Sequence, residues 1–293
     1  MSNSYTEAII DVPEAPTYWH GLSLGEAQWE IYNGDALEVL KELPDEFYNC
    51  IITSPPYFWL RDYGVDGQIG LEQSVEDYVT ALNNVMTECQ RVLKKDGVLF
   101  LNMGDTYYSG KGQPHGPDRK HNARRFGLRA VDKSGGLGIG LKPKSLIGIP
   151  WRVALEMTTQ DWALRSTIIW HREHCLPEPV RDRPRRSYEY VFLFTKHRKY
   201  HFDREALIET GEEDMWTISA RPKLTNGIQT APFPDELVQR CLDIGCPEGG
   251  AVLDPFAGAG TTLRVAISTG RPATGIELNP EFCEYMVRQL NTL

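Results

Sequence analysis

A glycine-rich turn near the carboxyl end constrains the fold of this chain more than any other feature. An apolar run at residues 251–253 leads into Asp254-Pro255-Phe256-Ala257-Gly258-Ala259-Gly260, and a helical pattern follows over residues 261–268. Glycine lets the backbone turn tightly and leaves room for a ligand to approach it. This strand, turn and helix therefore predict an α/β fold in which a nucleoside cofactor lies against the turn.

The position of this turn determines how the sheet must be assembled. A dinucleotide-binding fold normally begins with its glycine turn, yet only about thirty residues follow it here, enough for one further strand and helix. That strand, at residues 273–277, ends in Glu277. In dinucleotide-binding folds, a carboxylate roughly 20 residues beyond the glycine turn holds the ribose hydroxyls, and Glu277 lies close to that spacing. The remaining strands must therefore come from the amino-terminal part of the chain.

A second motif, Thr53-Ser54-Pro55-Pro56-Tyr57, follows the apolar pair Ile51-Ile52. Each proline ring fixes one φ angle, so the backbone of this segment is stiff. We expect the Ser54 side chain and the nearby carbonyl groups to be held ready for a polar ligand beside the Tyr57 ring.

With these two motifs in this order, the chain resembles the S-adenosylmethionine-dependent amino methyltransferases of DNA, which methylate N4 of cytosine or N6 of adenine. The order is the circular permutation that puts the catalytic motif before the cofactor motif. Further segments are similar to this family at residues 34–40, 97–105, 142–150, 164–170, 187–194 and 230–234. The resemblance implies one methyltransferase domain over residues 1–293, with a Rossmann-like, seven-stranded, mostly parallel sheet, helices on both faces and a basic loop insertion.

The hydrophobic patterns agree with such a sheet. Short apolar runs predict strands at residues 29–32, 49–53, 98–102, 165–170, 188–194, 251–253 and 273–277. Helical patterns lie at residues 36–43, 75–93, 149–159, 235–244, 261–268 and 280–290. Alternation of strands and helices indicates a mostly parallel sheet covered on both faces. Because residues 188–194 follow another strand, they are expected to pair antiparallel with residues 165–170.

The resemblance assigns the chemistry to Ser54, Pro55, Pro56 and Tyr57. Methylation of an exocyclic amine needs groups that accept the amine hydrogens while the methyl sulfonium lies in line behind the nitrogen. Ser54 Oγ and the Pro55 carbonyl are the expected acceptors, and Tyr57 is expected to stack on a base flipped out of the duplex. Asp105 either accepts the departing proton or caps a neighbouring segment. A Pro-Pro turn with a buried tyrosine is the purely structural alternative.

The cysteines and Ser54 bear on the identity of the methylated atom. Methylation at C5 of cytosine requires a cysteine nucleophile, usually in a Pro-Cys dipeptide, and none of the six cysteines follows a proline. Family members that act on N4 of cytosine often carry serine where adenine enzymes often carry aspartate, so Ser54 favours cytosine and leaves adenine open. An RNA amine or a protein glutamine is a further alternative substrate. A non-catalytic DNA-binding domain would not need the Ser54–Tyr57 motif.

The resemblance also implies a binding site for S-adenosylmethionine. Phe256, Gly258 and Gly260 are expected to shape the turn under the methionine part, and Glu277 to hold the ribose. Asp35 contacts the adenine amine or caps the helix at residues 36–43. Phe233 packs either on the methionine or in the core. Thr261 and Thr262 either bind the carboxylate of the cofactor or merely begin a helix. The remaining candidates are Asp254 and Asn279.

Charge is distributed unevenly along the chain. The net charge is −9, but residues 111–144 hold nine Lys or Arg against two acids, and residues 171–204 hold nine against five. These segments carry +7 and +4, which leaves −20 for the remainder and predicts a DNA-facing cleft on an acidic body. Solvated loops and a charged helix face are the alternative. The candidate DNA contacts are Lys111, Lys120, Arg124, Arg125, Arg129, Arg181, Arg183, Arg185 and Arg186.

Two segments are too irregular to belong to the layered core. Residues 109–140 contain eight glycines among basic residues, far beyond a typical connection of about 4–6 residues, and predict a mobile, DNA-facing loop. Residues 204–229 lie where the family keeps its target-recognition region, which is short here.

Composition restricts the class of protein and its partners. No apolar run approaches the roughly 18 residues of a membrane span and no export signal begins the chain, so we expect a soluble protein of the cytoplasm, without a membrane partner, from a bacterium, archaeon or phage. The cysteines lack C-x-x-C spacing and are expected to be reduced. His171, His174 and Cys175 have no second ligand pair at metal spacing, so no metal is expected. Double-stranded DNA is the expected partner, a cognate restriction endonuclease is a candidate partner, and the oligomeric state is left open.

Overall fold

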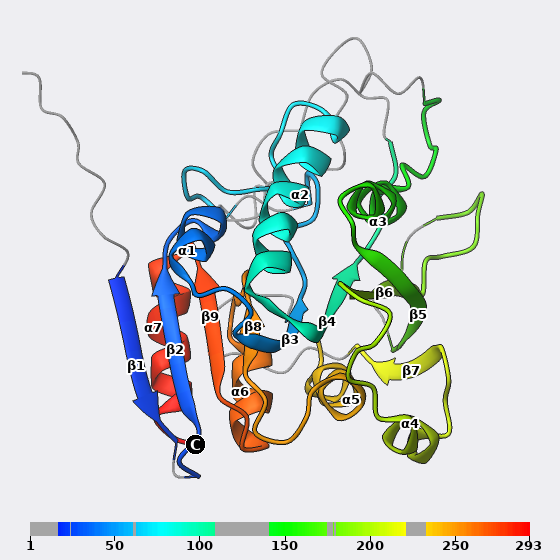
Figure 1. Ribbon diagram of the computed structural model, residues 1–293. Coiled ribbons are helices and arrows are strands. Elements are labelled where there is room, and N and C mark those ends of the chain that lie inside the picture. The colour runs from blue at the N-terminus through cyan, green and yellow to red at the C-terminus, as the bar shows by residue number, and fades with distance from the viewer. Residues whose placement is uncertain are drawn as a thin grey trace, which may run out of the picture.

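The computed structural model describes residues 17–23, 25–60, 63–108, 141–174, 178, 180–220 and 233–293. Within these residues, nine strands form one mixed sheet in the order β1-β2-β9-β8-β3-β4-β6-β5-β7 (Figure 1). The strands are β1 (Thr17–Leu22), β2 (Gln28–Asn33), β3 (Tyr48–Thr53), β4 (Leu93–Met103), β5 (Ala163–Glu173), β6 (Tyr188–Thr195), β7 (Met215–Ser219), β8 (Val252–Asp254) and β9 (Ala273–Glu277).

The middle of the sheet is parallel, as predicted. Strands β2, β9, β8, β3 and β4 run side by side in one direction. Strand β6 pairs antiparallel with both β4 and β5, which confirms the predicted hairpin. The α/β class and the mostly parallel sheet are therefore confirmed.

The sheet has two strands that the sequence did not predict, so the expected count of seven was wrong. Strand β1 pairs antiparallel with β2 at one edge, and β7 pairs parallel with β5 at the other. An edge strand pairs with a neighbouring strand on one side only. The hydrophobic pattern of such a strand is correspondingly weak in the sequence. Within residues 204–220, expected to lie in a target-recognition region, α4 (Arg204–Thr210) and β7 extend the fold, and Trp216 and Ile218 are buried. Residues 221–229 lie outside the described residues.

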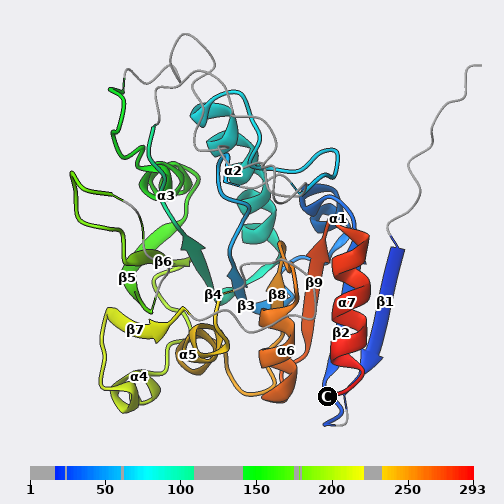
Figure 2. The same cartoon turned by 180° about the vertical axis from the view of Figure 1, so that it is seen from behind.

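Helices cover both faces of the sheet. The helices α1 (Ala36–Glu42), α2 (Val75–Val92) and α3 (Ile149–Thr159) share one core cluster, and α4, α5 (Asp235–Gly245), α6 (Thr261–Ser268) and α7 (Pro280–Leu290) share the other. The two layers are visible in opposite views, since α7 lies behind β2 in Figure 1 and in front of it in Figure 2. The predicted helices are confirmed to within a residue or two at their ends.

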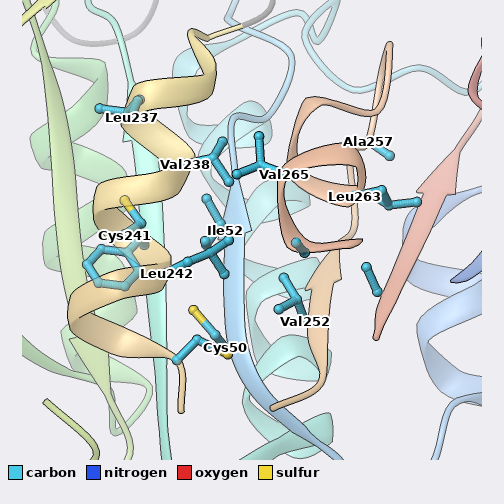
Figure 3. Packing of buried hydrophobic residues seen from close by; sticks show 14 of the residues in the cluster. Cys50, Ile52, Leu237, Val238, Cys241, Leu242, Val252, Ala257, Leu263 and Val265 are labelled. Carbon is cyan, nitrogen blue, oxygen red and sulfur yellow. The ribbon is translucent and has the colours of Figure 1, made fainter. Parts of the chain in front are cut away.

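Alternation along the strands supplies both cores. Ile51 of β3 packs in the cluster beneath α1 to α3, whereas its neighbours Cys50 and Ile52 pack in the other cluster. In Figure 3, Val238 and Leu242 of α5 lie against Ile52. Such strands, buried on both faces, are read in the sequence as continuous apolar runs.

The strand directions position the candidate site. The carboxyl ends of parallel strands meet at one edge of a sheet, so Asn33, Thr53, Met103, Asp254 and Glu277 end their strands along the same edge. Because β6 is antiparallel to β4, its amino end is brought to this edge as well.

Candidate active site

A cavity of about 480 Å³ opens along this edge of the sheet. It brings the Ser54-Pro55-Pro56-Tyr57 motif together with the glycine turn and the end of β9. The predicted cofactor residues that line it are Asp35, Phe233, Asp254, Phe256, Gly258, Thr261, Glu277 and Asn279. Gly260 and Thr262 are not among the lining residues, and each has a structural role instead.

The two glycines of the turn differ in what surrounds them. Both adopt left-handed backbone angles, with φ of +53° at Gly258 and +79° at Gly260. A Cβ atom added at Gly258 would meet nothing within 4 Å, whereas one at Gly260 would lie 2.6 Å from Cγ of Met286. Gly258 therefore borders open space in the cavity, and Gly260 permits close packing of α6 on α7.

Asp254 links the glycine turn to the end of β3, just before the Ser54–Tyr57 loop. Its buried carboxylate accepts hydrogen bonds from Thr53 Oγ1 at 2.6 Å, Thr262 Oγ1 at 2.7 Å and the backbone N–H of Phe256 at 3.0 Å. Burial raises the pKa of Asp254 to about 6. Thr262 thus holds the end of β8 instead of facing the cavity. This position agrees with the alternative that Thr262 merely begins a helix.

Glu277, the residue predicted to hold the ribose, ends β9. Its carboxylate accepts hydrogen bonds from the backbone N–H of Gly258 and of Asn279, both at 2.8 Å, and lines the cavity. Burial raises its pKa to about 6. The two backbone donors orient the carboxylate between the turn after β8 and the turn after β9.

Asp35 and Phe233 each have the structural role that the sequence offered as an alternative, and each also lines the cavity. Asp35 Oδ1 accepts from the backbone N–H of Glu38 at 3.1 Å and so caps α1, while the residue also lines the cavity. Phe233 lines the cavity and packs against the core beneath α5 and α6. The rest of its predicted segment, residues 230–232, lies outside the described residues.

The Ser54–Tyr57 loop is held by hydrogen bonds from neighbouring elements. Tyr78 of α2 donates to the Pro56 carbonyl at 2.9 Å. The Tyr57 hydroxyl lies 3.4 Å from Ser54 Oγ and donates to Glu189 Oε2 at 2.7 Å. Burial, and then the negative charge of Glu189, raise the pKa of Tyr57 well above its usual range. The hydroxyl therefore stays protonated, with Glu189 Oε2 as its nearer acceptor and Asn102 Oδ1 3.2 Å away.

Glu189 lies at the centre of a polar cluster that the motifs did not identify. Arg172 donates to its Oε1 at 2.8 Å, and Asn102 lies within 3.4 Å of its Oε2. A Cβ atom on Gly104 would lie 2.7 Å from the Tyr57 ring, so only glycine leaves space there. The one signal in the sequence was an acidic residue inside the apolar strand at residues 188–194.

Asp105 is engaged with the backbone. Its carboxylate accepts hydrogen bonds from the N–H groups of Thr106, Gly148 and Ile149 at 2.8 to 3.1 Å, which caps α3. Burial raises its pKa. Although Asp105 lines the cavity, this geometry favours the capping role over the proton-accepting role.

The predicted DNA contacts fall into four groups. Arg183 makes a two-point ion pair with Glu178 and stacks 3.8 Å from the Tyr107 ring, so its guanidinium is engaged within the chain. Arg181 and Arg185 are exposed, and Arg186 lines the cavity. The remaining candidates, Lys111, Lys120, Arg124, Arg125 and Arg129, lie outside the described residues.

Two neighbouring residues of β5, Trp170 and His171, differ in their position relative to the cavity. Trp170 lines the cavity and donates to the Ile218 carbonyl at 3.1 Å, whereas His171 is not among the lining residues. Searched over the described residues, the structure holds no cluster of three or more His, Cys, Asp or Glu placed to bind a metal. Cys175 lies outside that part of the chain. None of the helices that the structure describes is long and apolar enough to cross a membrane.

Comparison with known proteins identifies the family of this chain. Residues 48–288 match the family of N6/N4 methyltransferases described as DNA methylase. The chain is 42% identical over 267 residues to the type II methyltransferase M.Cfr9I of Citrobacter freundii, covering 89% of this chain and 87% of that protein. It is 42% identical over 262 residues to M.SmaI of Serratia marcescens, covering 86% and 87%.

A solved structure shows the same fold. The PvuII DNA methyltransferase, described as cytosine-N4-specific, superposes with a TM-score of 0.68 at 21% sequence identity. The superposition covers 92% of this chain and 89% of that one.

Proposed function

Since this chain belongs to the N6/N4 family of DNA methylases and is a DNA methyltransferase, we propose that it transfers a methyl group from S-adenosylmethionine to N4 of a cytosine in duplex DNA. The observation that carries the proposal is the single cavity that joins Ser54 and Tyr57 to the Gly258 turn and Glu277. One part of this cavity suits a base and the adjoining part suits a nucleoside.

The cofactor part of the cavity has the donors and acceptors that the methyl donor needs. The Glu277 carboxylate would accept hydrogen bonds from the ribose hydroxyls, and Asp35 would accept from the adenine amine. The open side of Gly258 leaves space for the ligand against the backbone. When bound, S-adenosylmethionine supplies a methyl group on a positively charged sulfur.

The base part of the cavity would bind a cytosine flipped out of the helix. Tyr57 would stack on the base and recover part of the few kcal/mol needed to extrude it, at about 1–3 kcal/mol per stacked base. Ser54 Oγ and the Pro55 carbonyl would accept the amine hydrogens, which turns the nitrogen lone pair towards the methyl group. Ser54 supports cytosine as the target because adenine enzymes of this family often carry aspartate at that position.

Methylation of adenine at N6 is the second candidate, because the matched family contains both activities by name. The exposed Arg181 and Arg185, together with the basic residues at 109–140, are the proposed DNA-facing surface. Residues 204–229 are the proposed target-recognition region, and an endonuclease acting on the same DNA sequence is the proposed partner.

Mapping of modified bases tests this proposal. The protein would be expressed in a host without other DNA methyltransferases, and the host DNA read by single-molecule sequencing, with Ser54→Ala as the inactive control. We expect N4-methylcytosine at one short sequence. N6-methyladenine would establish the second candidate, and unmodified DNA from cells containing folded, cofactor-binding protein would refute both.

A further inference from the structure

Two hydroxyl oxygens lead from the proposed reaction centre to the carboxylate of Glu189 on β6. Ser54 Oγ lies 3.4 Å from the Tyr57 hydroxyl oxygen, which lies 2.7 Å from Glu189 Oε2. The first distance is longer than a usual O–H···O hydrogen bond, and such contacts commonly tighten when the substrate binds. The second is a charge-assisted hydrogen bond of normal length.

The proposed reaction needs an acceptor for a proton. An exocyclic amine that gains a methyl group carries one hydrogen too many, and the protonated nitrogen is a strong acid because its lone pair no longer conjugates with the ring. A weak base is therefore sufficient, provided that it is connected to the nitrogen. The acidic residues among the described lining of the cavity are Asp35, Asp105, Glu189, Asp254 and Glu277.

Four of these carboxylates are engaged in other ways. Asp35 caps α1, Asp105 caps α3 and Asp254 is held by two threonine hydroxyls. Glu277 accepts from two backbone N–H groups on the cofactor side of the cavity. Among these five carboxylates, only Glu189 accepts a hydrogen bond from the hydroxyl that contacts Ser54.

We propose that Glu189 takes up the proton released by the target amine, through the hydroxyls of Ser54 and Tyr57. This inference rests on the proposed function. As nitrogen binds the methyl carbon, the electron pair of the broken carbon–sulfur bond stays on sulfur. The amine proton moves to Ser54 Oγ, the Ser54 proton to the Tyr57 oxygen, and the Tyr57 proton to Glu189.

Charge is balanced in this step. Each hydroxyl accepts one proton and gives one away, so Ser54 and Tyr57 are neutral before and after the transfer. The positive charge of the sulfonium and the negative charge of Glu189 disappear together, and Glu189 later releases its proton to solvent. Because Tyr57 never ionises, its strongly raised pKa is compatible with this path.

The surroundings of Glu189 suit a positioning residue that acts through Tyr57. The Glu189 side chain is 12% exposed, and the Arg172 guanidinium at 2.8 Å compensates its charge. Asn102 donates to the Tyr190 carbonyl at 3.1 Å and lies within 3.4 Å of Glu189, which fixes the second oxygen. Arg172 and Asn102 thus hold Oε2 towards the Tyr57 hydroxyl.

Two isosteric substitutions test the relay. Glu189→Gln keeps an oxygen that can accept from Tyr57 but cannot take up a proton, and Tyr57→Phe keeps the stacking ring but removes the hydroxyl. We expect each to lower the single-turnover methylation rate on the order of 10²-fold, with little change in affinity for S-adenosylmethionine or for duplex DNA carrying the mapped site. The double variant should be no slower than the slower single variant, since both interrupt one path.

Matched controls separate the relay from general damage. Tyr188→Phe and Glu173→Gln make the same chemical changes at exposed positions beside the cluster and should methylate at the wild-type rate. Tyr57→Phe keeps the test valid if Glu189→Gln unfolds, because it removes only one oxygen. A wild-type rate in either single variant, or losses that multiply in the double variant, would overturn the relay. Failure of the wild-type protein to methylate any DNA would instead refute the proposed function.

Discussion

The two glycines of the cofactor turn should fail in different ways when each is replaced by alanine. A left-handed backbone costs an L residue roughly 1–2 kcal/mol, and this term applies to both positions. At Gly258 nothing lies within 4 Å of the new methyl group, so Gly258→Ala should lower the free energy of unfolding by about 1–2 kcal/mol only. Its methyl group would occupy space in the cavity, and affinity for S-adenosylmethionine should fall.

Gly260→Ala carries a second penalty. Its methyl group would lie 2.6 Å from Cγ and 2.9 Å from Sδ of Met286, which is buried on α7. Overpacking of this kind costs about 1–3 kcal/mol, so the total loss of unfolding free energy should reach about 2–5 kcal/mol. The variant that remains folded should bind S-adenosylmethionine normally, because Gly260 does not line the cavity.

Equilibrium urea unfolding and titration calorimetry measure the two effects separately. Pairing Gly260→Ala with Met286→Ala should destabilise less than the sum of the single changes, because the smaller side chain relieves the clash. Equal losses of unfolding free energy in the two glycine variants, or wild-type affinity of Gly258→Ala for S-adenosylmethionine, would contradict these different roles for Gly258 and Gly260.

Three further outcomes are expected. Ser54→Ala and Tyr57→Ala should each lower the methylation rate by about 10²–10³-fold, by analogy with the loss of one oriented hydrogen-bonding group. Calorimetry should show unchanged affinity of both variants for S-adenosylmethionine. Normal turnover in both variants would contradict the proposed base site. Affinity for S-adenosylmethionine should be constant above neutral pH and weaken as pH falls through about 6, because protonation of Glu277 removes an acceptor for ribose. Glu277→Gln should bind S-adenosylmethionine weakly and without that pH dependence. A parallel decline of affinity in both proteins would assign the effect to another group. Joint replacement of Lys120, Arg124 and Arg125 with alanine should weaken DNA binding and reduce its salt slope by about 1 for each lost phosphate contact, and superimposable salt slopes would place the DNA surface elsewhere.

The sequence predicted the parts of the site that are local in the chain. The glycine turn, Glu277 at the end of β9 and the Ser54–Tyr57 loop could each be read from a few adjacent residues, and the strand directions brought them to one edge. The helices were predictable for the same reason, because capping residues and apolar spacing are local. The cap of α1 by Asp35 was one of the two roles that its position in the sequence offered.

Contacts between distant segments could not be predicted in this way. The hydrogen bond from Tyr57 to Glu189 joins residues 132 positions apart, and the one from Thr53 to Asp254 joins residues 201 positions apart. Asp254 was predicted only as a cofactor ligand, because nothing nearby in the sequence indicated that two threonines would surround its carboxylate. Edge strands β1 and β7 were missed because their pairing is one-sided and their side chains are less strictly patterned.

The strand order has a consequence for how the chain is synthesised. Strands β8 and β9 lie in the interior of the sheet, between β3 and β2, yet they are the last two strands to leave the ribosome. Until then the nascent chain holds β2 and β3 without the strands that separate them, with unpaired backbone groups along the facing edges. The central strands are therefore added last and the sheet is completed late, as expected for contacts between residues so far apart in sequence. A truncated translation product that ends before β8 would contain the complete Ser54–Tyr57 loop but lack the glycine turn, so we expect such a product not to bind S-adenosylmethionine.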